Sequence, residues 1–394
     1  MRLKKILALG IIFLFIGIPA VPSGGQKIEK LSSPTSRGDW LYVGGSGPGN
    51  YTRIRDAIDN ASDGDTVFVF DDSSPYYENV VVDKSIQLIG ENKTSTVIDG
   101  RWKGDTLQIT ASSVDVANSA QHGIYVAEQT PCIRDIHIMN CIVAKNAGGI
   151  RFDKVGSSSI QNCWIHNNSG CSIDVILSST DIVIANCIVC DNGGIVDGLE
   201  LPGSISICGQ GGENNWCLNT SISNCDIYRN YDEGIFLSIV KNAAIHNNHV
   251  HENNGGGISV NGYGGPSYNV SIYNNIISGN RRLDKFSSGV YLQDCSNCVT
   301  IQKNMITFNA GHGVFLLRSH GHHIFENNFI ENQRDAFLIN SNSKWKQNYW
   351  ERPRVIPFPV FGLMKIGFLY IPWVNFDWYP AQTPYDIGGK ANEK

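Results

Sequence analysis

The sequence predicts an all-β fold in which short parallel strands wind into a stack of coils. Three observations carry this prediction: a nine-residue segment recurs eight times, glycine is unusually frequent, and the composition is that of a folded chain. Glycine accounts for 41 of the 394 residues, and it supplies the left-handed backbone conformation that tight turns need. The shares of charged residues (17%) and hydrophobic residues (42%) are typical of a soluble globular protein.

Residues 1–24 have the pattern of a secretory signal peptide. Three basic residues within the first five are followed by an apolar run from Ile6 to Ile18 and then by small residues. This run is shorter than the roughly 20 residues of a membrane-spanning helix, although an uncleaved anchor stays an alternative. We therefore expect a secreted or extracytoplasmic protein, either free or associated with the cell surface.

The charge balance excludes nucleic acid as an expected partner. The chain has 31 basic and 36 acidic residues, a net charge of -5, and no basic run beyond the N-terminus. A second apolar stretch, Val355 to Val374, contains three prolines and Lys365, so we expect no transmembrane domain in the mature chain. We expect a monomer.

The repeated segment has the form of IQNCWIHNN and is centred on a Cys or Asn that we call the anchor. The residues three before and two after the anchor are apolar in every copy, and the residue directly before it is Asn in seven copies. Two apolar positions five apart can both face inward only if the strand bends between them, which predicts a bend at this Asn. The anchors are Cys141, Cys163, Cys187, Cys225, Asn248, Asn275, Asn304 and Asn328.

A glycine followed by an aliphatic pair comes about eight to ten residues after most anchors, which indicates a further strand in each coil. Identical columns predict parallel stacking, with the Asn side chains bonded from coil to coil and the four Cys anchors packed as a core stack. An antiparallel sandwich is the alternative, but it would not keep identical columns. We expect about eleven coils. Export would permit disulfides, and Cys208 with Cys217 is the best local pair, although the pairing stays open.

Both ends of such a stack need covers. Residues 40–65 are expected to form an N-terminal cap with a short helix, capped by Thr52 and running to about Ala61. The regular repeats span 133–345 within a solenoid of 40–345. The aromatic-rich residues 346–394 are expected to form the C-terminal capping tail, and any exposed part would mark a partner or glycan surface.

Three segments carry a resemblance to a known family: WLYVGGSGPGNYTRIRDAIDNASDGDTVFVF at 40–70, KSIQLIGENKTSTVIDG at 84–100, and NYW at 348–350. The chain resembles the right-handed parallel β-helix proteins of the pectate-lyase-like superfamily, in particular the NosD-like repeat proteins. The resemblance implies the β-helix fold, which serves lyases, hydrolases, binding proteins and adhesins alike. It also implies a possible role in copper delivery, because NosD-like proteins are described as copper-binding accessory factors.

The resemblance also implies that a substrate would lie along an outward-facing column of one sheet. Arg151, Asp174 and Glu200 are our catalytic candidates, since two carboxylates on consecutive coils would suit a glycoside hydrolase. The position of Glu200 assumes that GLEL forms the strand of its coil. A surface ion pair of Arg151 with Asp174 is the structural alternative. The candidates for substrate-binding aromatic platforms are Tyr125, Phe236, Tyr291 and Phe315.

Metal ligands are sparse in the sequence. The candidates are Asp226, His249 and His251, because Asp226 would stack on His249 from the preceding coil. A second histidine group lies at 320–323. The methionines are scattered, so no copper(I) site of soft ligands is evident, and we identify no cofactor. We therefore expect a carbohydrate-recognising protein, with polysaccharide hydrolase or lyase activity open. The alternatives are a NosD-like copper-binding accessory protein and a purely structural or adhesive solenoid.

Overall fold

The computed structural model describes residues 38–101, 104–121, 123–127, 132–210, 215–262, 264–281, 288–296 and 299–388. The expected signal peptide lies outside the described residues. No helix within them is long and apolar enough to cross a membrane.

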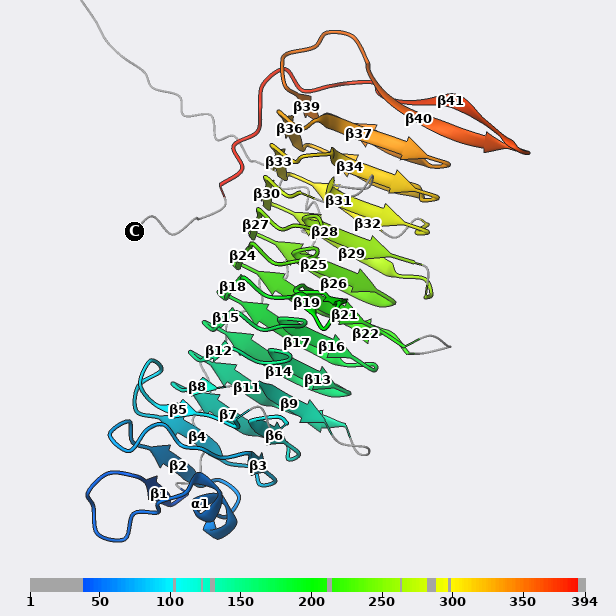
Figure 1. The fold of residues 1–394 in the computed structure, drawn as a ribbon. Helices are drawn as coiled ribbons and strands as arrows, with labels where there is room; N and C mark the ends of the chain where they lie inside the picture. Colours follow the sequence, from blue (N-terminus) through cyan, green and yellow to red (C-terminus); the bar gives the residue numbers. More distant parts are fainter. Residues whose placement is uncertain are drawn as a thin grey trace, which may run out of the picture. The chain divides into compact units, whose positions relative to one another are not determined.

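The chain forms a right-handed parallel β-helix of about thirteen coils, each contributing strands to up to three faces (Figure 1). We expected about eleven coils, which is the number of strands on face 3; the coils at the ends of the stack add strands to the other two faces. The repeat signal missed these coils because they lack the anchor motif.

The strands stack in register within each face. Face 1 consists of β3 (Val80–Val82), β6 (Leu107–Ile109), β9 (Ile124–Ala127), β13 (Ile150–Asp153), β16 (Ile173–Ile176), β21 (Ile205–Cys208), β25 (Ile235–Ser238), β28 (Ile258–Asn261), β31 (Ser288–Gln293), β34 (His312–Leu317), β37 (Arg334–Ile339) and β40 (Phe358–Ile366). Face 2 consists of β1 (Trp40–Val43), β2 (Thr66–Val69), β4 (Gln87–Gly90), β7 (Val114–Ala117), β10 (Ile133–Arg134), β11 (Ile136–Met139), β14 (Val155–Gln161), β17 (Thr180–Ala185), β22 (Cys217–Leu218), β23 (Ser221–Ser223), β26 (Val240–His246), β29 (Tyr268–Tyr273), β32 (Val299–Gln302), β35 (His320–Phe325), β38 (Asn342–Lys346) and β41 (Leu369–Asp377). Face 3 consists of β5 (Val97–Ile98), β8 (Ala120–Gln121), β12 (Ile142–Ala144), β15 (Trp164–His166), β18 (Ile188–Cys190), β24 (Asp226–Tyr228), β27 (His249–His251), β30 (Ile276–Ser278), β33 (Met305–Thr307), β36 (Asn328–Ile330) and β39 (Tyr349–Trp350).

The bend before each anchor is confirmed. Asn140 and Asn247, for example, have φ of 54° and 55°, the left-handed conformation that Asn tolerates better than most residues. The apolar positions on both sides of the bend are buried, as at Ile138 and Val143. One expected anchor was wrong by a residue: Asn327, and not Asn328, continues the column. The adjacent pair of asparagines made the two alignments equally plausible from the sequence.

Two columns of buried asparagines bind successive coils together. In the anchor column, the side-chain amide of each Asn donates to the side-chain oxygen of the next, from Asn248 to Asn348. A second column five residues further along runs from Asn146 to Asn332 in the same way. These bonds satisfy polar groups that the bends bring into the interior.

The cysteines of the anchor column pack as the expected core stack. Cys141, Cys163, Cys187 and Cys225 are buried among the apolar columns. The best local pair for a disulfide, Cys208 and Cys217, is not bonded in the structure, where both are free thiols. Cys208 ends β21 on face 1, whereas Cys217 begins β22 on face 2.

The N-terminal cap is the helix α1 (Ile54–Asn60), which covers the first coil with Ile54, Ala57 and Ile58. Thr52 does not cap this helix, contrary to our expectation. The Glu78 carboxylate instead accepts hydrogen bonds from the backbone N–H groups of Ile54 and Arg55. A residue distant in sequence therefore satisfies the first orphan donors of the helix.

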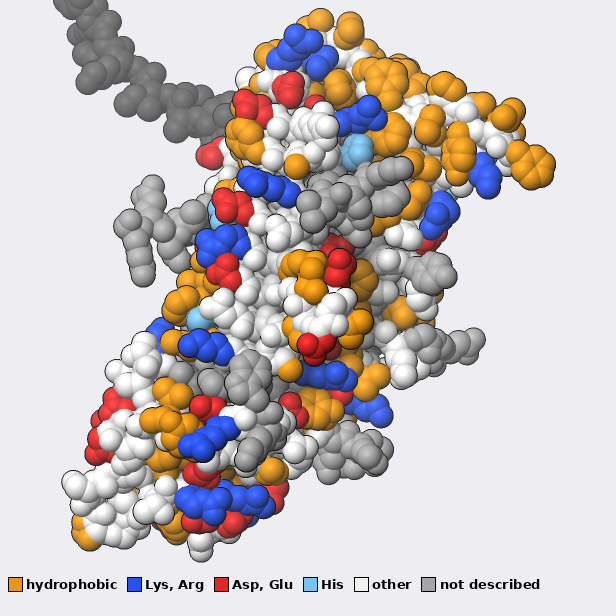
Figure 2. All heavy atoms as spheres, viewed as in Figure 1, with side chains coloured by type: hydrophobic (Ala, Val, Ile, Leu, Met, Phe, Trp, Pro, Cys, Tyr) orange, Lys and Arg blue, Asp and Glu red, His pale blue; other side chains and the backbone are white. Residues whose placement is uncertain are grey.

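The C-terminal segment only partly forms a cap. Trp350 is buried against Phe329 and Phe358, so this part closes the last coil. The antiparallel hairpin β40–β41, however, projects past the strands beneath it (Figure 1) and carries many exposed hydrophobic side chains (Figure 2).

We expect His322 on face 2 to make the stability of the fold depend on pH. Its ring is buried, its Nδ1 accepts the backbone N–H of Val299, and burial lowers its pKa from 6.5 to about 4. As the pH falls, the His322 ring gains its proton near pH 6.5 in the unfolded chain but only near pH 4 in the folded chain. Protonation therefore favours the unfolded chain between these two values. We expect this residue to remove about 2–3 kcal/mol of stability between pH 6.5 and pH 4.

Urea unfolding of the wild type and of His322→Asn at pH 7, 6, 5 and 4 measures this contribution, since the Asn oxygen can accept the same N–H. The variant should lose less stability over that pH range than the wild type. Equal losses in both proteins would contradict the assignment to His322.

Candidate functional site

The outward column of face 1 brings three of the expected residues together. Arg151 on β13 pairs in register with Tyr125 on β9 and with Asp174 on β16. Their neighbours Ile150 and Phe152 point into the core, as strand alternation requires. Adjacent strands lie about 4.8 Å apart, so these three side chains form one continuous surface.

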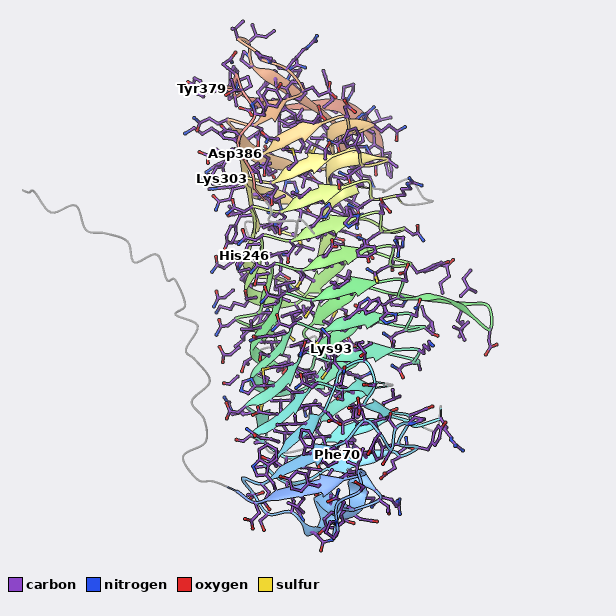
Figure 3. All side chains as sticks on the ribbon, turned by 90° about the vertical axis from the view of Figure 1, so that its left-hand side faces the viewer. Phe70, Lys93, His246, Lys303, Tyr379 and Asp386 are labelled. Carbon is purple, nitrogen blue, oxygen red and sulfur yellow. The ribbon has the colours of Figure 1, made fainter. Side chains whose placement is uncertain are left out.

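Glu200 does not join this column. Ser206 on β21 pairs with Asp174 and then with Phe236 on β25, so it occupies the place that we expected for Glu200. Glu200 lies instead in the antiparallel hairpin of β19 (Gly194–Val196) and β20 (Leu199–Leu201). This hairpin is the green one that projects from the middle of the stack in Figure 3, where His246 and Lys303 mark another edge of the coils. The extra residues between β18 and β21 form this hairpin and carry the GLEL segment out of the coil. Asp174 and Glu200 therefore do not form the expected stacked pair.

The expected aromatic platforms divide into two groups. Tyr125 and Phe236 are partly exposed and can contact a ligand. Tyr291 and Phe315 were wrong as platforms, because the two rings stack on each other and are only 8% and 1% exposed. Phe337 and His312 stack against Phe315 and complete its burial.

The ion pair of Arg151 lies within its own strand. Its guanidinium donates to both carboxylate oxygens of Asp153 at 2.9 and 3.2 Å, so the ion-pair partner is Asp153 and not the expected Asp174. The Tyr125 hydroxyl donates to the same carboxylate at 3.0 Å. Asp153 therefore holds Arg151 and Tyr125 in place, and the remaining N–H groups of Arg151 are available to a ligand.

These residues lie at a pocket of about 380 Å³ that we call the face 1 pocket. Tyr125, Arg151 and Asp174 line it, with Asp105 from the segment before β6 and Leu201 from the β19–β20 hairpin. Sequence reasoning missed Asp105, which carries no repeat signal. It also missed Asp153, although alternation along β13 places Asp153 on the same side as Arg151.

The two carboxyl groups at the pocket have perturbed acidity. Burial raises the pKa of Asp174, against the opposing effects of Ser206 and Arg151. Burial likewise raises the pKa of Asp105, and Arg151 opposes it. Burial raises the pKa of Cys171, which also lines the pocket, to about 12, and this disfavours its reactive thiolate form. Carboxyl groups of raised pKa in a pocket are candidates for proton transfer.

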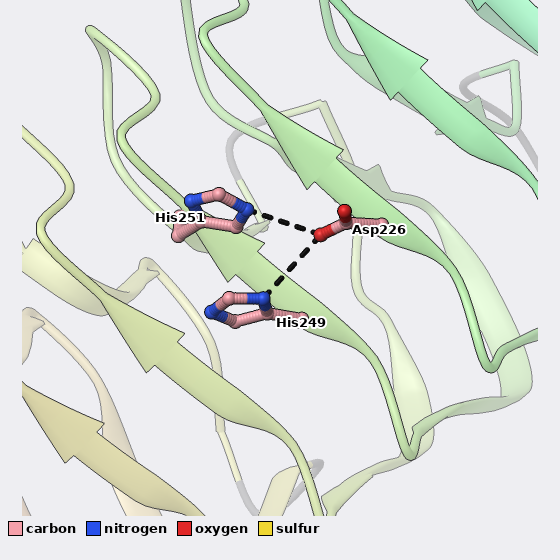
Figure 4. A group of neighbouring side chains, drawn as sticks. All are labelled: Asp226, His249 and His251. Carbon is pink, nitrogen blue, oxygen red and sulfur yellow. Dashed lines mark hydrogen bonds and ion pairs between the residues drawn. The ribbon is translucent and has the colours of Figure 1, made fainter. Parts of the chain in front are cut away.

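A separate group of side chains lies on face 3 (Figure 4). Asp226 on β24 pairs in register with His249 on β27, as expected, and His251 follows two residues later on the same side. His249 Nδ1 lies 3.4 Å and His251 Nε2 lies 3.0 Å from the same oxygen of Asp226. The three potential ligand atoms all lie within 4.8 Å of one another.

In this face 3 triad, the two separations from Asp226 to the histidines suit a metal site. A tetrahedral ion bound at 2.0–2.1 Å holds its ligands about 3.3 Å apart, close to the two separations above. Imidazole and carboxylate suit a borderline divalent ion such as Zn²⁺ or Cu²⁺ rather than copper(I), which prefers sulfur. The histidines at 320–323 do not form a second group: His322 is buried, whereas His320 and His323 are exposed.

Comparisons with known proteins agree with this architecture. Residues 66–203 match the family model for a right handed beta helix region, and residues 205–357 match the model for the periplasmic copper-binding protein NosD. No curated protein matches the chain.

Several solved structures are similar to this fold at low sequence identity. The A-module of the mannuronan C-5 epimerase AlgE6 from Azotobacter vinelandii is 18% identical with a TM-score of 0.58, over 74% of this chain and 93% of that one. The AlgE4 A-module from the same organism is 16% identical with a TM-score of 0.55, over 72% and 92%. The periplasmic alginate epimerase AlgG is 11% identical with a TM-score of 0.51, over 71% and 72%. The chain is therefore a right-handed parallel β-helix in which one segment matches the right handed beta helix region and the next matches NosD.

Proposed function

We propose that this protein recognises a polysaccharide outside the cytoplasm, with the face 1 pocket at the centre of the binding surface. The observation that carries the proposal is the convergence of Tyr125, Arg151 and Asp174 on one pocket. An aromatic ring can stack on a sugar, while Arg and Asp side chains can bond to its hydroxyl groups. The similar epimerase structures, whose titles name mannuronan and alginate, support a glycan as ligand.

The binding surface extends along the stack of coils. Phe236 lies four strand spacings from Tyr125 in the same column, which is a distance of about 19 Å. An extended chain running across the strands would contact both aromatic rings and pass over Asp174. Glu200 stays in the proposal as a contact from the β19–β20 hairpin, and not as the partner of Asp174.

Polysaccharide cleavage, by hydrolysis or by elimination, is the activity open to this site. Asp174 and Asp105 are the groups that we propose for proton transfer, because burial raises the pKa of both carboxyl groups. Arg151 is held by Asp153 and would bind and orient the sugar rather than move a proton.

A polysaccharide panel that includes alginate tests the proposal. Binding to the full chain is recorded together with new reducing ends and unsaturated ends. We expect Asp174→Asn and Arg151→Gln to weaken glycan binding about tenfold or more, which corresponds to about 1.4 kcal/mol. Loss of product with retained binding in Asp174→Asn would identify Asp174 as catalytic.

The face 3 pair of Arg229 and Asp191 provides matched controls. Arg229 also donates to both oxygens of an aspartate, at 2.8 Å each, but neither residue of this pair lines the face 1 pocket. Asp191→Asn and Arg229→Gln should therefore leave glycan binding unchanged. The proposal is refuted if no glycan binds, or if the control variants weaken binding as much as the pocket variants.

The face 3 triad supports a second candidate function, the binding and delivery of a divalent metal ion. The triad lies within the residues that match the NosD model, and its donor atoms have the spacing of metal ligands. Asp226, His249 and His251 would hold the ion as cargo and leave a coordination position open to a partner.

Equilibrium dialysis of the full chain against Zn²⁺ and against Cu²⁺ tests this second function. His251→Gln should reduce the metal bound per chain. His166→Gln is the control, because His166 lies on face 3 in the column that contains His251, three strands earlier. Equal metal binding by all three proteins would remove the triad from consideration.

A further inference from the structure

The β40–β41 hairpin presents apolar side chains where a soluble protein normally has polar ones. Phe368 at its turn is fully exposed, and the flanking Ile366 and Leu369 are 60% and 70% exposed. The stretch from Phe358 to Phe376 contains one charged residue, Lys365. An exposed patch of this kind usually marks a binding surface.

Both faces of the hairpin are apolar, which distinguishes it from an ordinary docking strand. Strand alternation places Phe361, Leu363, Tyr370 and Pro372 on one face, with Lys365 as the polar exception. The opposite face carries Met364, Ile366, Leu369, Ile371 and Trp373. A protein partner docked on one face would leave the other exposed to water, whereas lipid surrounds an inserted hairpin on both faces.

The backbone of the hairpin is already paired. The two strands stay in antiparallel register from Phe358 with Asp377 to Ile366 with Leu369, closed by a turn at Gly367 and Phe368. β40 also pairs with the preceding coil at Gly362 and Leu363, and the strand continues beyond that contact. The cross-strand hydrogen bonds of the projecting part satisfy the backbone groups that face the partner strand. The groups on its outer edges still need polar partners, which limits insertion to the interfacial region of a bilayer.

Side chains along the hairpin follow the polarity of a membrane surface. Isoleucine, phenylalanine and leucine lie at the turn, Tyr370 and Lys365 come next, and Trp373 lies four residues behind Leu369. Tyrosine and tryptophan favour the interface of a bilayer, and a lysine near the tip can extend its ammonium group towards the headgroups. The three cross-strand pairs nearest the turn span about 10 Å at a rise of about 3.4 Å per residue. This length matches the 5–10 Å depth to which an interfacial element enters a bilayer.

We propose that the tip of the β40–β41 hairpin inserts into the surface of a lipid bilayer and holds the β-helix at a membrane. The contact is driven by apolar burial, since Lys365 is the one charged residue from Phe358 to Phe376. Binding should therefore depend little on anionic lipid. This membrane contact is independent of the glycan and metal sites on faces 1 and 3.

Vesicle flotation of the full chain tests the proposal, with phosphatidylcholine vesicles prepared with and without phosphatidylglycerol. We expect the double variant Phe368→Ser, Leu369→Ser to bind vesicles at least about tenfold more weakly than the wild type, because two apolar side chains no longer leave water on binding. The matched control is Ile195→Ser, Leu199→Ser in the β19–β20 hairpin, where the two residues are 63% and 68% exposed. All three proteins carry the same N-terminal segment, so its contribution cancels.

A tryptophan placed at each hairpin locates the contact directly. Because the chain already contains eight tryptophans, the emission that each variant adds is measured as its difference from the wild type. The emission added by Phe368→Trp should be quenched by lipids that carry a quencher on the acyl chain, and the emission added by Ile195→Trp should not. Vesicle binding equal to that of the control variant, or no quenching at position 368, would overturn the proposal. So would a lipid-free dimer that the Phe368→Ser, Leu369→Ser variant abolishes, because a second copy of the chain would then cover the hairpin.

Discussion

Replacing Trp350 by alanine is expected to lower the free energy of unfolding by about 4 kcal/mol, the largest effect of any single substitution that we predict. The Trp350 ring is fully buried, with its centroid 4.5 Å from that of Phe329 and 4.0 Å from that of Phe358. Its Nε1 donates to Asp377 at 3.1 Å. The substitution would therefore open a cavity beneath the last coil and remove a donor from a buried carboxylate.

Urea unfolding measures this effect, with Trp378→Ala as the control. Trp378 lies in the same C-terminal segment but is mostly exposed, so its removal should change the unfolding free energy by less than about 0.5 kcal/mol. Similar losses in the two variants would show that Trp350 does not seal the end of the stack.

The second large effect is expected for Asn304→Leu, which should destabilise the protein by about 3 kcal/mol or more. The Asn304 amide donates to the carbonyl oxygens of Ile272 and Gln302 and to the side chain of Asn327. Its own side-chain oxygen accepts from the backbone and side chain of Asn275. Leucine has a similar size, so the variant keeps the volume and removes the hydrogen bonds that link three coils.

Asn254→Leu is the control for this substitution, because Asn254 is exposed in a turn and lies outside both asparagine columns. The same unfolding experiment should find little change in that variant. If Asn304→Leu proved as stable as Asn254→Leu, the asparagine columns would not be a main source of cohesion between coils.

The candidate site was predictable only where it follows the regular repeat. Arg151 and Asp174 were placed correctly because their strands belong to consecutive coils of ordinary length. Glu200 was misplaced because an insertion separates it from the coil, and nothing local reveals whether GLEL stays in the sheet or leaves it. Asp105 comes to the pocket from a segment without a repeat signal, so only the folded chain brings it near Arg151.

The repeat pattern also could not predict how far the outward-facing residues are exposed to solvent. Alternation correctly turned Tyr291 and Phe315 away from the core, yet neighbouring coils stack aromatic rings against them and exclude a ligand. The hairpin tip shows the opposite case. An apolar tail was expected to pack as a cap, but its outer half extends past the last coil that could cover it.

The coil, the bends and the core follow from the amino-acid pattern alone, because every coil must place the same residue types in the same columns to stack on its neighbours. Which polar groups meet depends on the folded chain, since the loops between strands vary in length and their paths depend on contacts with several coils. The Arg151 ion pair, the position of Glu200 and the exposed hairpin all belong to this second group. The cause is physical: stacking depends on a repeated local pattern, whereas a site depends on distances between segments that the repeat does not relate.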